Sequence, residues 1–261
     1  MSVPEVIQTW QMVQPTSRDR ETKEVTPGKI EKTEIPVPDL EPGEVLVEIA
    51  GCGVCHTDLG YFYDGVPTVS KPPLTLGHEI SGKVVAGDES WIGKEVIIPA
   101  VMPCRKCILC KTGRGNRCLN QKMPGNSLGP YGGFSSHIPV PSIDLCEVKN
   151  RGDIPLAHLA VVADAATTPY QAAKRADLQP GDNVVVVGIT GGVGQYMGQT
   201  AKALGVSALN GWTSFQCIQP MYNLVKRQAE VEILPLAQSE NLGVISYNPL
   251  AGGILSGKYG K

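Results

Sequence analysis

The sequence lacks any long apolar run. No stretch of 18 residues is continuously apolar, and no basic segment followed by an apolar one stands at its start. A membrane-spanning helix needs about 20 apolar residues, and a secretory signal has that charged-then-apolar order. A charge excess is lacking too, with 23 basic against 25 acidic residues. The sequence therefore predicts a cytoplasmic protein without a nucleic-acid or membrane partner.

A second absence is local: residues 183–229 contain no Asp or Glu. This range includes "VVVVGITGGVG", an apolar run followed by a glycine-rich turn of the kind that binds dinucleotides. In such sites an acidic residue about twenty positions after the glycines holds the ribose hydroxyl. Here "NGWTSFQ" (residues 210–216) occupies that place. The ribose half of a nucleotide site is therefore missing from the pattern.

The first part of the chain is rich in short β-type runs. Examples are "GEVLVEIAG", "HEISGKVVAG", "KEVIIPAV" and "FSSHIPVP", broken every ten or so residues by Gly, Pro and Asp. This pattern is typical of barrels and sandwiches. It predicts an all-β domain over residues 1–150, within a mixed α+β chain.

The later part alternates strand and helix signals. Residues 151–205 begin with an Ala-rich, helix-prone stretch, and residues 206–261 continue the alternation. Consecutive βαβ units predict a small parallel sheet, and a sheet of about three strands leaves exposed edges that favour a homo-oligomer. The expected elements are strand 183–188, helix 192–204, strand 215–219, helix 226–241 and strand 243–247.

The strongest motif is Cys104-x2-Cys107-x2-Cys110-x7-Cys118. Four thiolates close a tetrahedron around zinc and leave no open position, which is typical of a structural site. Basic residues between and beside the cysteines favour the thiolate form. Four unrelated free cysteines are the alternative, and an iron–sulfur cluster is disfavoured because it usually has a shorter last spacing followed by Pro.

A second group combines Cys55, in "GCGVCHTD", with His78, in "GHE". The pair is half of a zinc site, although a core Cys and a hydrogen-bonded core His explain it equally well. Asp164 favours the zinc site, because it lies in an apolar run where an unpaired carboxylate is costly and a metal would pair with it. Three ligands leave one position for water or substrate, as a catalytic zinc requires. Asp58 is expected to orient His78, and Glu79 to approach the metal.

The sequence from residue 184 to 205 predicts a strand, a glycine turn and a helix. In this arrangement the backbone approaches a pyrophosphate held at the helix N-terminus, so the turn predicts half of a nicotinamide dinucleotide site. A tight βα turn without a ligand is the alternative. The turn residues are Gly188, Gly191, Gly192, Val193 and Gly194.

Taken in order, "GVCHTD", "LGHEISG", the four-cysteine loop and "VVVVGITGGVG" resemble a zinc-dependent medium-chain alcohol dehydrogenase over residues 1–205. The resemblance implies a GroES-like β-barrel domain followed by the truncated start of a Rossmann domain. It also implies two zinc ions per chain and NAD, or NADP, as cofactor. Within the family the N-terminal stretches are most similar to 6-hydroxycyclohex-1-ene-1-carbonyl-CoA dehydrogenases. That similarity implies an alcohol or an alicyclic hydroxyacyl-CoA as substrate.

The resemblance also implies roles for individual residues. Cys55, His78 and Asp164 hold the catalytic zinc, Thr57 passes the alcohol proton, and His56 lies near the cofactor pyrophosphate.

The chain departs from the family at Gly60, where many members place a relay histidine, so the proton would leave by another route. Three further cysteines match no metal position and are expected to be free, buried thiols: Cys52, Cys146 and Cys217.

Residues 206–261 resemble a second family. "IQPMYNL" and "VISYNPLAGG" are similar to the later strands of an aldo-keto reductase barrel, so the chain reads as a chimera joined within "AKALG". The resemblance implies that Gln219 and Tyr247 contact nicotinamide in that family. Its catalytic residues lie on earlier strands that this chain lacks, so Tyr222 and Tyr247 are expected to pack at strand ends.

Three functions remain open at this point. The first is a zinc-dependent oxidoreductase that transfers a hydride between an alcohol and a nicotinamide cofactor, impaired by its incomplete nucleotide domain. The second is a non-catalytic zinc-binding remnant. The third, carbonyl reduction by the aldo-keto segment, lacks the catalytic residues of that family.

Overall fold

The computed structural model describes residues 3–19, 21–179, 184, 186 and 188–203, with short pieces at 217–218, 230, 234–235, 238 and 243–244. The chain divides into two compact units, Met1–Asp164 and Ala165–Lys261. Within the described residues, no helix combines the length and apolar character needed to cross a membrane. The sequence boundaries near residues 150 and 205 stay predictions.

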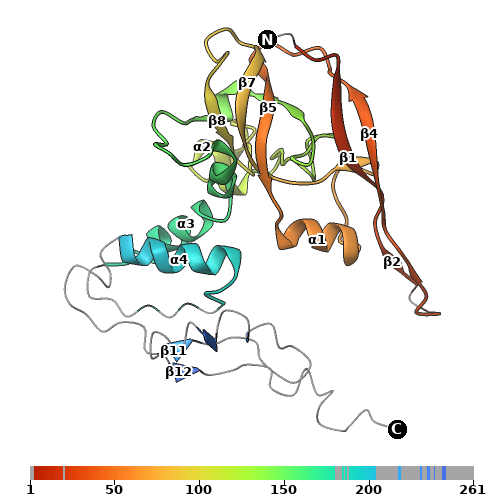
Figure 1. Ribbon diagram of the computed structural model, residues 1–261. Helices are drawn as coiled ribbons and strands as arrows, with labels where there is room; N and C mark the ends of the chain where they lie inside the picture. The colour runs from red at the N-terminus through yellow and green to blue at the C-terminus, as the bar shows by residue number, and fades with distance from the viewer. Residues whose placement is uncertain are drawn as a thin grey trace. The chain divides into compact units, whose positions relative to one another are not determined.

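The first unit consists mainly of β-strands joined by long loops (Figure 1). Its strands are β1 (Val6–Gln14), β2 (Ser17–Arg18), β3 (Val25–Thr26), β4 (Lys29–Pro36), β5 (Glu44–Gly53), β6 (Leu74–Thr75), β7 (Glu79–Gly87), β8 (Glu95–Ile98), β9 (His137–Pro141) and β10 (Cys146–Glu147). Its helices are α1 (His56–Tyr63) and α2 (Ile108–Lys111), with the short 3-10 helices η1 (Gly115–Arg117), η2 (Ser142–Asp144) and η3 (Leu156–Ala163).

The two larger sheets of this unit are antiparallel. One has the order β10-β8-β7-β5-β9 and the other the order β4-β1-β6. The strands predicted from the four β-type runs are confirmed as β5, β7, β8 and β9. The main core lies on the five-stranded sheet and consists of Val45, Val47, Ile80, Val84, Val96, Ile98, Met102, Ile138 and Val140.

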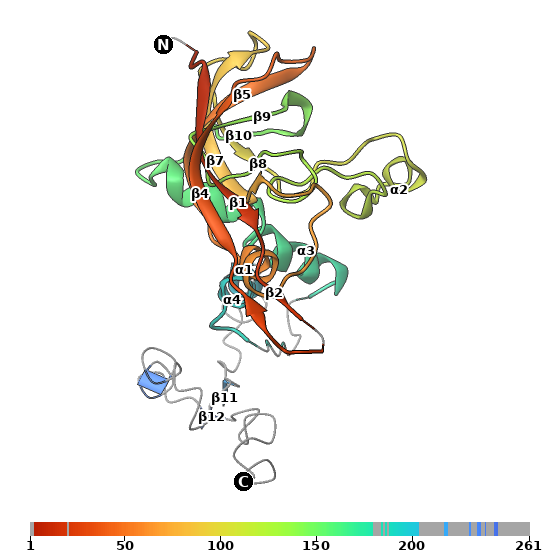
Figure 2. The ribbon, with the colours of Figure 1, turned by 90° about the vertical axis from the view of Figure 1, so that its right-hand side faces the viewer.

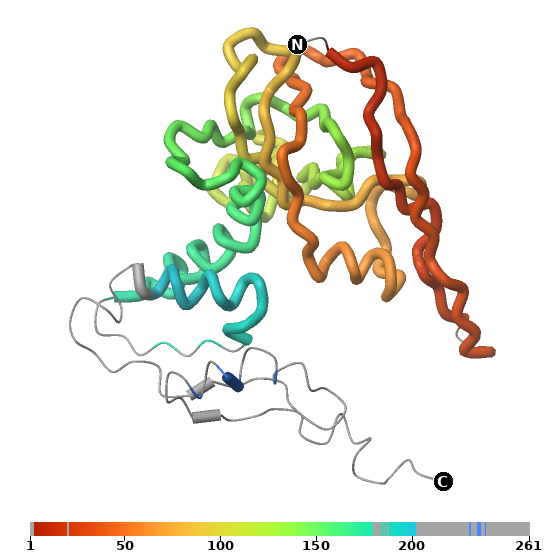
Figure 3. The backbone as a smooth tube through the Cα atoms, in the orientation of Figure 1, coloured from red at the N-terminus to blue at the C-terminus, as the bar shows by residue number. Residues whose placement is uncertain are grey.

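The central strand of the three-stranded sheet, β1, has one buried and one exposed face. Ile7 and Thr9 point inward, whereas Gln8 and Trp10 are exposed, which is the alternation expected of a strand with one solvated face. β1 and β4 continue into the hairpin of β2 and β3, which extends away from the sheets (Figure 2). The tube view shows the start of β1 at the opposite end of the unit from this hairpin (Figure 3).

The Ala-rich stretch predicted as helical is interrupted at Asp164. Before it lies η3, and after it lies α3 (Thr167–Arg175) in the second unit. The break places Asp164 directly after η3, as the residue that caps its C-terminus.

The second unit contains α3 and α4 (Gly192–Ala203), which contact each other. α4 confirms the predicted helix 192–204. β11 (Cys217–Ile218) and β12 (Gly243–Val244) pair in parallel, in agreement with the parallel sheet expected there. Strand 183–188 and helix 226–241 lie largely outside the described residues, and Gln219, Tyr222 and Tyr247 lie wholly outside them.

Candidate metal centres and nucleotide turn

The four-cysteine motif folds into a loop that brings its sulfur atoms together. The Sγ of Cys110 lies 4.0 Å from that of Cys104 and 3.5 Å from that of Cys107, and the Sγ atoms of Cys107 and Cys118 are 3.8 Å apart. A tetrahedron with zinc–sulfur bonds of about 2.3 Å has edges of about 3.8 Å. The donor set therefore fits a closed zinc site.

Backbone amides help to polarise these thiols. The N–H groups of Leu119 and Cys110 lower the pKa of Cys107 to about 6, and the N–H groups of Lys106 and Cys107 lower the pKa of Cys104. Burial raises the pKa of Cys110 to about 12. Without a metal the loop therefore retains protons, and a bound cation would displace them.

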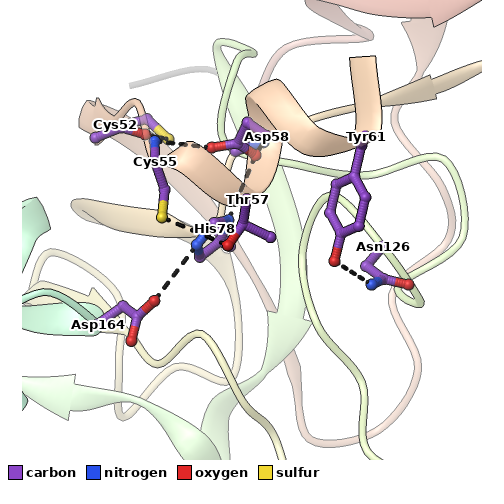
Figure 4. A network of polar contacts seen from close by, with 10 residues as sticks. Cys52, Cys55, Thr57, Asp58, Tyr61, His78, Asn126 and Asp164 are labelled. Atoms are coloured by element: carbon purple, nitrogen blue, oxygen red, sulfur yellow. Dashed lines mark hydrogen bonds and ion pairs between the residues drawn. The ribbon is translucent and has the colours of Figure 1, made fainter. Parts of the chain in front are cut away.

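The second donor group comprises Cys55, His78, Glu79 and Asp164, whose ligand atoms all lie within 4.8 Å of one another. Cys55 is the N-cap of α1, His78 and Glu79 lie at the start of β7, and Asp164 follows η3. Figure 4 shows the Asp164 and Cys55 side chains directed toward His78. The structure thus brings together the three residues predicted as ligands. It also places the Glu79 carboxylate within the same donor group.

His78 is the buried centre of this group, with only 1% of its surface exposed. Its Nε2 lies 3.5 Å from Asp164 Oδ2, and its Nδ1 lies 3.4 Å from Asp58 Oδ1. These distances allow attraction, but they exceed the roughly 2.7–3.2 Å of a good hydrogen bond, and both ring nitrogens lack a hydrogen-bond partner. A metal at Nε2 would satisfy the nitrogen that faces Asp164 and Cys55.

The charges around His78 are mainly negative. Burial alone lowers the pKa of His78, but the carboxylates of Asp164 and Asp58 and the Cys55 sulfur raise it, and the resulting pKa is about 10. The same surroundings that retain a proton on the imidazole would attract a divalent cation. Metal uptake would then release that proton.

Asp58 links two of the ligand-bearing segments. It is 2% exposed, and its two oxygens accept hydrogen bonds from the N–H of Cys55 at 3.0 Å and from the N–H of Gly77 at 2.9 Å. Because Gly77 precedes His78, one buried carboxylate fixes the spacing between the two ligands (Figure 4). The sequence interpretation gave Asp58 a role toward His78 only.

Two glycines make room for the site. A side chain at Gly53, which pairs with Glu79 across β5 and β7, would collide with the Glu79 carboxylate. Gly77 has φ of +95°, and a side chain there would contact the Cys52 sulfur at 2.8 Å. Sequence analysis missed both positions, although Gly53 lies in β5, where a glycine signals a close approach, and Gly77 lies in the connection between β6 and β7.

The remaining predicted residues occupy the edge of the group. The Cys55 thiol donates to the Thr57 hydroxyl at 3.6 Å, which places Thr57 beside the ligand sulfur. His56 is exposed at the first position of α1, and its proposed role toward the cofactor stays a prediction.

The glycine turn precedes α4 as expected. Gly188 has φ of +73°, and the Gly191 N–H donates to the Gly188 carbonyl oxygen at 3.0 Å. A side chain at Gly194 would collide with that carbonyl oxygen, whereas a side chain at Gly192 would meet no atom within 4 Å. The turn is therefore packed against the first turn of α4 at Gly194, while Gly192 has open space around it among the described residues. Val193 lies exposed there.

Two segments of the chain match models of known protein families. Residues 41–150 match the alcohol dehydrogenase GroES-like domain, and residues 189–261 match the aldo/keto reductase family. These matches, with the relative described next, support a protein of the zinc alcohol dehydrogenase type with an aldo/keto reductase segment.

An alcohol dehydrogenase of Geobacillus stearothermophilus is 37% identical over 185 residues, which cover 69% of this chain and 53% of that protein. The chain thus spans about half the length of the curated relatives that it matches.

Solved structures resemble it in fold. A cobalt- and zinc-bound thermostable alcohol dehydrogenase from Pyrobaculum aerophilum has a TM-score of 0.67 at 22% identity, over 95% of this chain and 68% of that chain. The short chain alcohol dehydrogenase from E. coli CFT073, complexed with NADH, has a TM-score of 0.69 at 20% identity, over 97% of this chain and 66% of that chain.

One cysteine of the GroES-like domain differs from expectation. Cys146, predicted to be buried, is exposed, because β10 is the outermost strand of its sheet. Cys52 is partly buried, and burial raises the pKa of its thiol to about 12. Neither residue joins a donor group, and Cys217 has no described side chain.

Gly194→Ala is expected to destabilise the turn before α4, since the added Cβ has no space beside Gly188. Overpacking of this kind costs about 1–3 kcal/mol. Thermal unfolding followed by circular dichroism should show a lower Tm for this variant. Gly192→Ala is the matched control and should unfold like the parent; equal Tm values for both variants would contradict the packing argument.

Proposed function

We propose that the protein is a zinc-dependent oxidoreductase that transfers a hydride between an alcohol and a nicotinamide cofactor. The main support is the donor group around His78: a thiol, an imidazole and carboxylates within 4.8 Å, with the imidazole nitrogens lacking hydrogen-bond partners. The glycine turn before α4 supports the cofactor side of the proposal.

Cys55, His78 and Asp164 would hold the catalytic zinc. Zinc bound there would polarise the oxygen of an alcohol or a carbonyl compound. The Thr57 hydroxyl, which accepts from the Cys55 thiol, would take the alcohol proton, and Glu79 would supply a further carboxylate next to His78.

The second zinc would be structural. Cys104, Cys107, Cys110 and Cys118 form a complete four-sulfur set, so no position remains for substrate. The proposed complement is therefore two zinc ions per chain, one in each donor group.

The substrate proposed is a small alcohol, with an alicyclic hydroxyacyl-CoA as the specific candidate. This candidate depends on the resemblance of the N-terminal stretches, "GVCHTD" and "LGHEISG", to CoA-linked members of the family. We expect a homo-oligomer, because a parallel sheet as small as the one proposed exposes its edges.

Cofactor binding is expected to be weak and to discriminate poorly between NAD and NADP. The helix N-terminus can hold the pyrophosphate, but the acid that would hold the ribose is absent from residues 183–229. Loss of one charge-assisted hydrogen bond costs about 1.5–3 kcal/mol, or roughly one to two decades of affinity.

This expectation and the proposed function can be tested together. NADH and NADPH are titrated separately into the purified chain while nicotinamide fluorescence is followed, and cyclohexanol-dependent reduction of NAD is then measured. Tight binding of NADH with strong preference over NADPH would contradict this expectation, because it would require a ribose-binding group elsewhere in the chain. Absence of any alcohol-dependent reduction, with two zinc ions bound, would overturn the enzymatic proposal.

A non-catalytic zinc-binding protein is the second candidate. The observation that favours it is the change of family match, from the GroES-like domain at residues 41–150 to aldo/keto reductase from residue 189 onward. Such a protein would bind both zinc ions and neither nicotinamide cofactor.

A further inference from the structure

A hollow opens in the GroES-like domain where its two sheets part. β5 pairs with β9 as far as Glu48, opposite His137. The preceding residue, Ser136, bonds to both strands: its carbonyl oxygen accepts the Ile49 N–H of β5 at 2.9 Å, and its N–H donates to the Gln8 carbonyl oxygen of β1 at 2.8 Å. The Trp10 N–H then donates to the Phe134 carbonyl oxygen at 3.0 Å, so the segment passes from β5 to β1, and residues of both strands line the hollow.

The hollow has the size of a small-molecule site. Its volume is about 390 Å³, and ligand pockets commonly measure about 300–1,000 Å³. Its walls include Gln8 and Trp10 of β1, Lys32 of β4, Ile49 of β5 and Ser136. None of the proposed metal ligands lines it, so it is separate from the donor group around His78.

Trp10 and Lys32 are two exposed residues of the lining. They are directly opposite on β1 and β4, so their side chains project from the same face. Trp10 is 54% exposed, which leaves much of a flat apolar ring in contact with solvent.

Lys32 is the one charged residue in the lining, which contains no Asp or Glu. Within the described part of the chain it enters no ion pair, and the ring–ammonium contacts there involve Lys94 with Trp91 and Lys174 with Tyr170. Its positive charge is therefore available to a ligand.

The other polar side chains of the wall are already engaged. The Gln8 side-chain amide donates to the Glu34 carboxylate, and the Ser136 hydroxyl accepts the Gln8 N–H at 3.0 Å. This leaves an aromatic surface and a single cation, with apolar contact from Ile49. We propose that the hollow binds a small planar organic anion, whose ring stacks on the Trp10 indole and whose carboxylate pairs with Lys32.

Benzoate is the simplest probe of this site, and benzamide is its neutral counterpart of similar shape. Both are titrated into the full chain by isothermal titration calorimetry and ligand-observed NMR. Aromatic stacking and a solvent-exposed ion pair are each modest, so we expect a dissociation constant on the order of 1 mM for benzoate and about fivefold weaker binding of benzamide.

Two lysines on the same strand provide a matched test. Lys32→Gln should remove the preference for benzoate over benzamide. Lys29→Gln should leave it unchanged, because Lys29 lies outside the lining and pairs with Glu31. Trp10→Leu should weaken both probes without lowering the Tm, since the indole is exposed.

Several results would overturn the proposal. Equal affinity of the parent chain for benzoate and benzamide would exclude recognition of the carboxylate. Equal effects of Lys29→Gln and Lys32→Gln would show that the preference for benzoate comes from general surface charge and not from Lys32. Unchanged binding by Trp10→Leu would place the ligand elsewhere. These outcomes are independent of alcohol oxidation, so failure here leaves the proposed enzyme untouched.

Discussion

Cys55→Ala is expected to lower the zinc content from two ions per chain to one and to abolish alcohol-dependent reduction of NAD. The substitution removes the only sulfur donor of the group around His78, and it leaves the four-cysteine loop intact. Elemental analysis and an activity assay with cyclohexanol measure the two effects. Loss of a ligand to a catalytic metal removes its full contribution, so residual activity should fall below about 1% of the parent.

Cys146→Ala is the matched control, because Cys146 is an exposed free thiol outside both donor groups. It should keep two zinc ions and full activity. A parent chain with one zinc, unchanged by Cys55→Ala, would remove the catalytic centre from the proposed function.

Asp58→Asn provides an intermediate case. An amide can accept one of the two backbone hydrogen bonds that Asp58 now accepts, from Cys55 and Gly77, but its NH2 group faces the other donor. Zinc at the His78 group should bind about 10–100-fold more weakly, as is typical when a partner of a metal ligand is replaced. The four-cysteine zinc should be retained.

Cys110→Ser should remove the other zinc ion and destabilise the GroES-like domain. The four sulfur atoms hold together the chain from Cys104 to Cys118, which protrudes from the sheets and has little apolar burial of its own (Figure 2). Loss of a structural metal belongs with the largest single-site effects, about 4 kcal/mol or more, which is roughly 8–16 °C in Tm for a domain of this size.

Thermal unfolding with and without a chelator measures this effect. The parent should lose a similar amount of stability when chelated, whereas Cys110→Ser should respond less to the chelator. A parent chain whose Tm is insensitive to chelation, with one zinc or none bound, would indicate four unrelated free cysteines.

Much of the fold was predictable because its signals are local. The runs around β5, β7, β8 and β9 alternate and end at Gly or Pro, so neighbouring residues decide that they are strands. The glycine turn and α4 were predicted for the same reason. By contrast, α1 was not predicted, because its cap is a cysteine and its stabilising Asp58 is recognised only through contacts with Cys55 and Gly77.

The four-cysteine loop could be recognised without the structure, since all four ligands lie within one short segment and little of the chain must be ordered to bring such close neighbours together. The composition of the second donor group depends instead on how the chain packs. Cys55, His78 and Asp164 come from three distant segments, and their convergence depends on the pairing of β5 with β7 and on the packing of η3 against both. That pairing also places Glu79 opposite Gly53, where the absence of a side chain leaves room for the Glu79 carboxylate. The positions of such long-range partners depend on the whole packed core, so no local pattern encodes them.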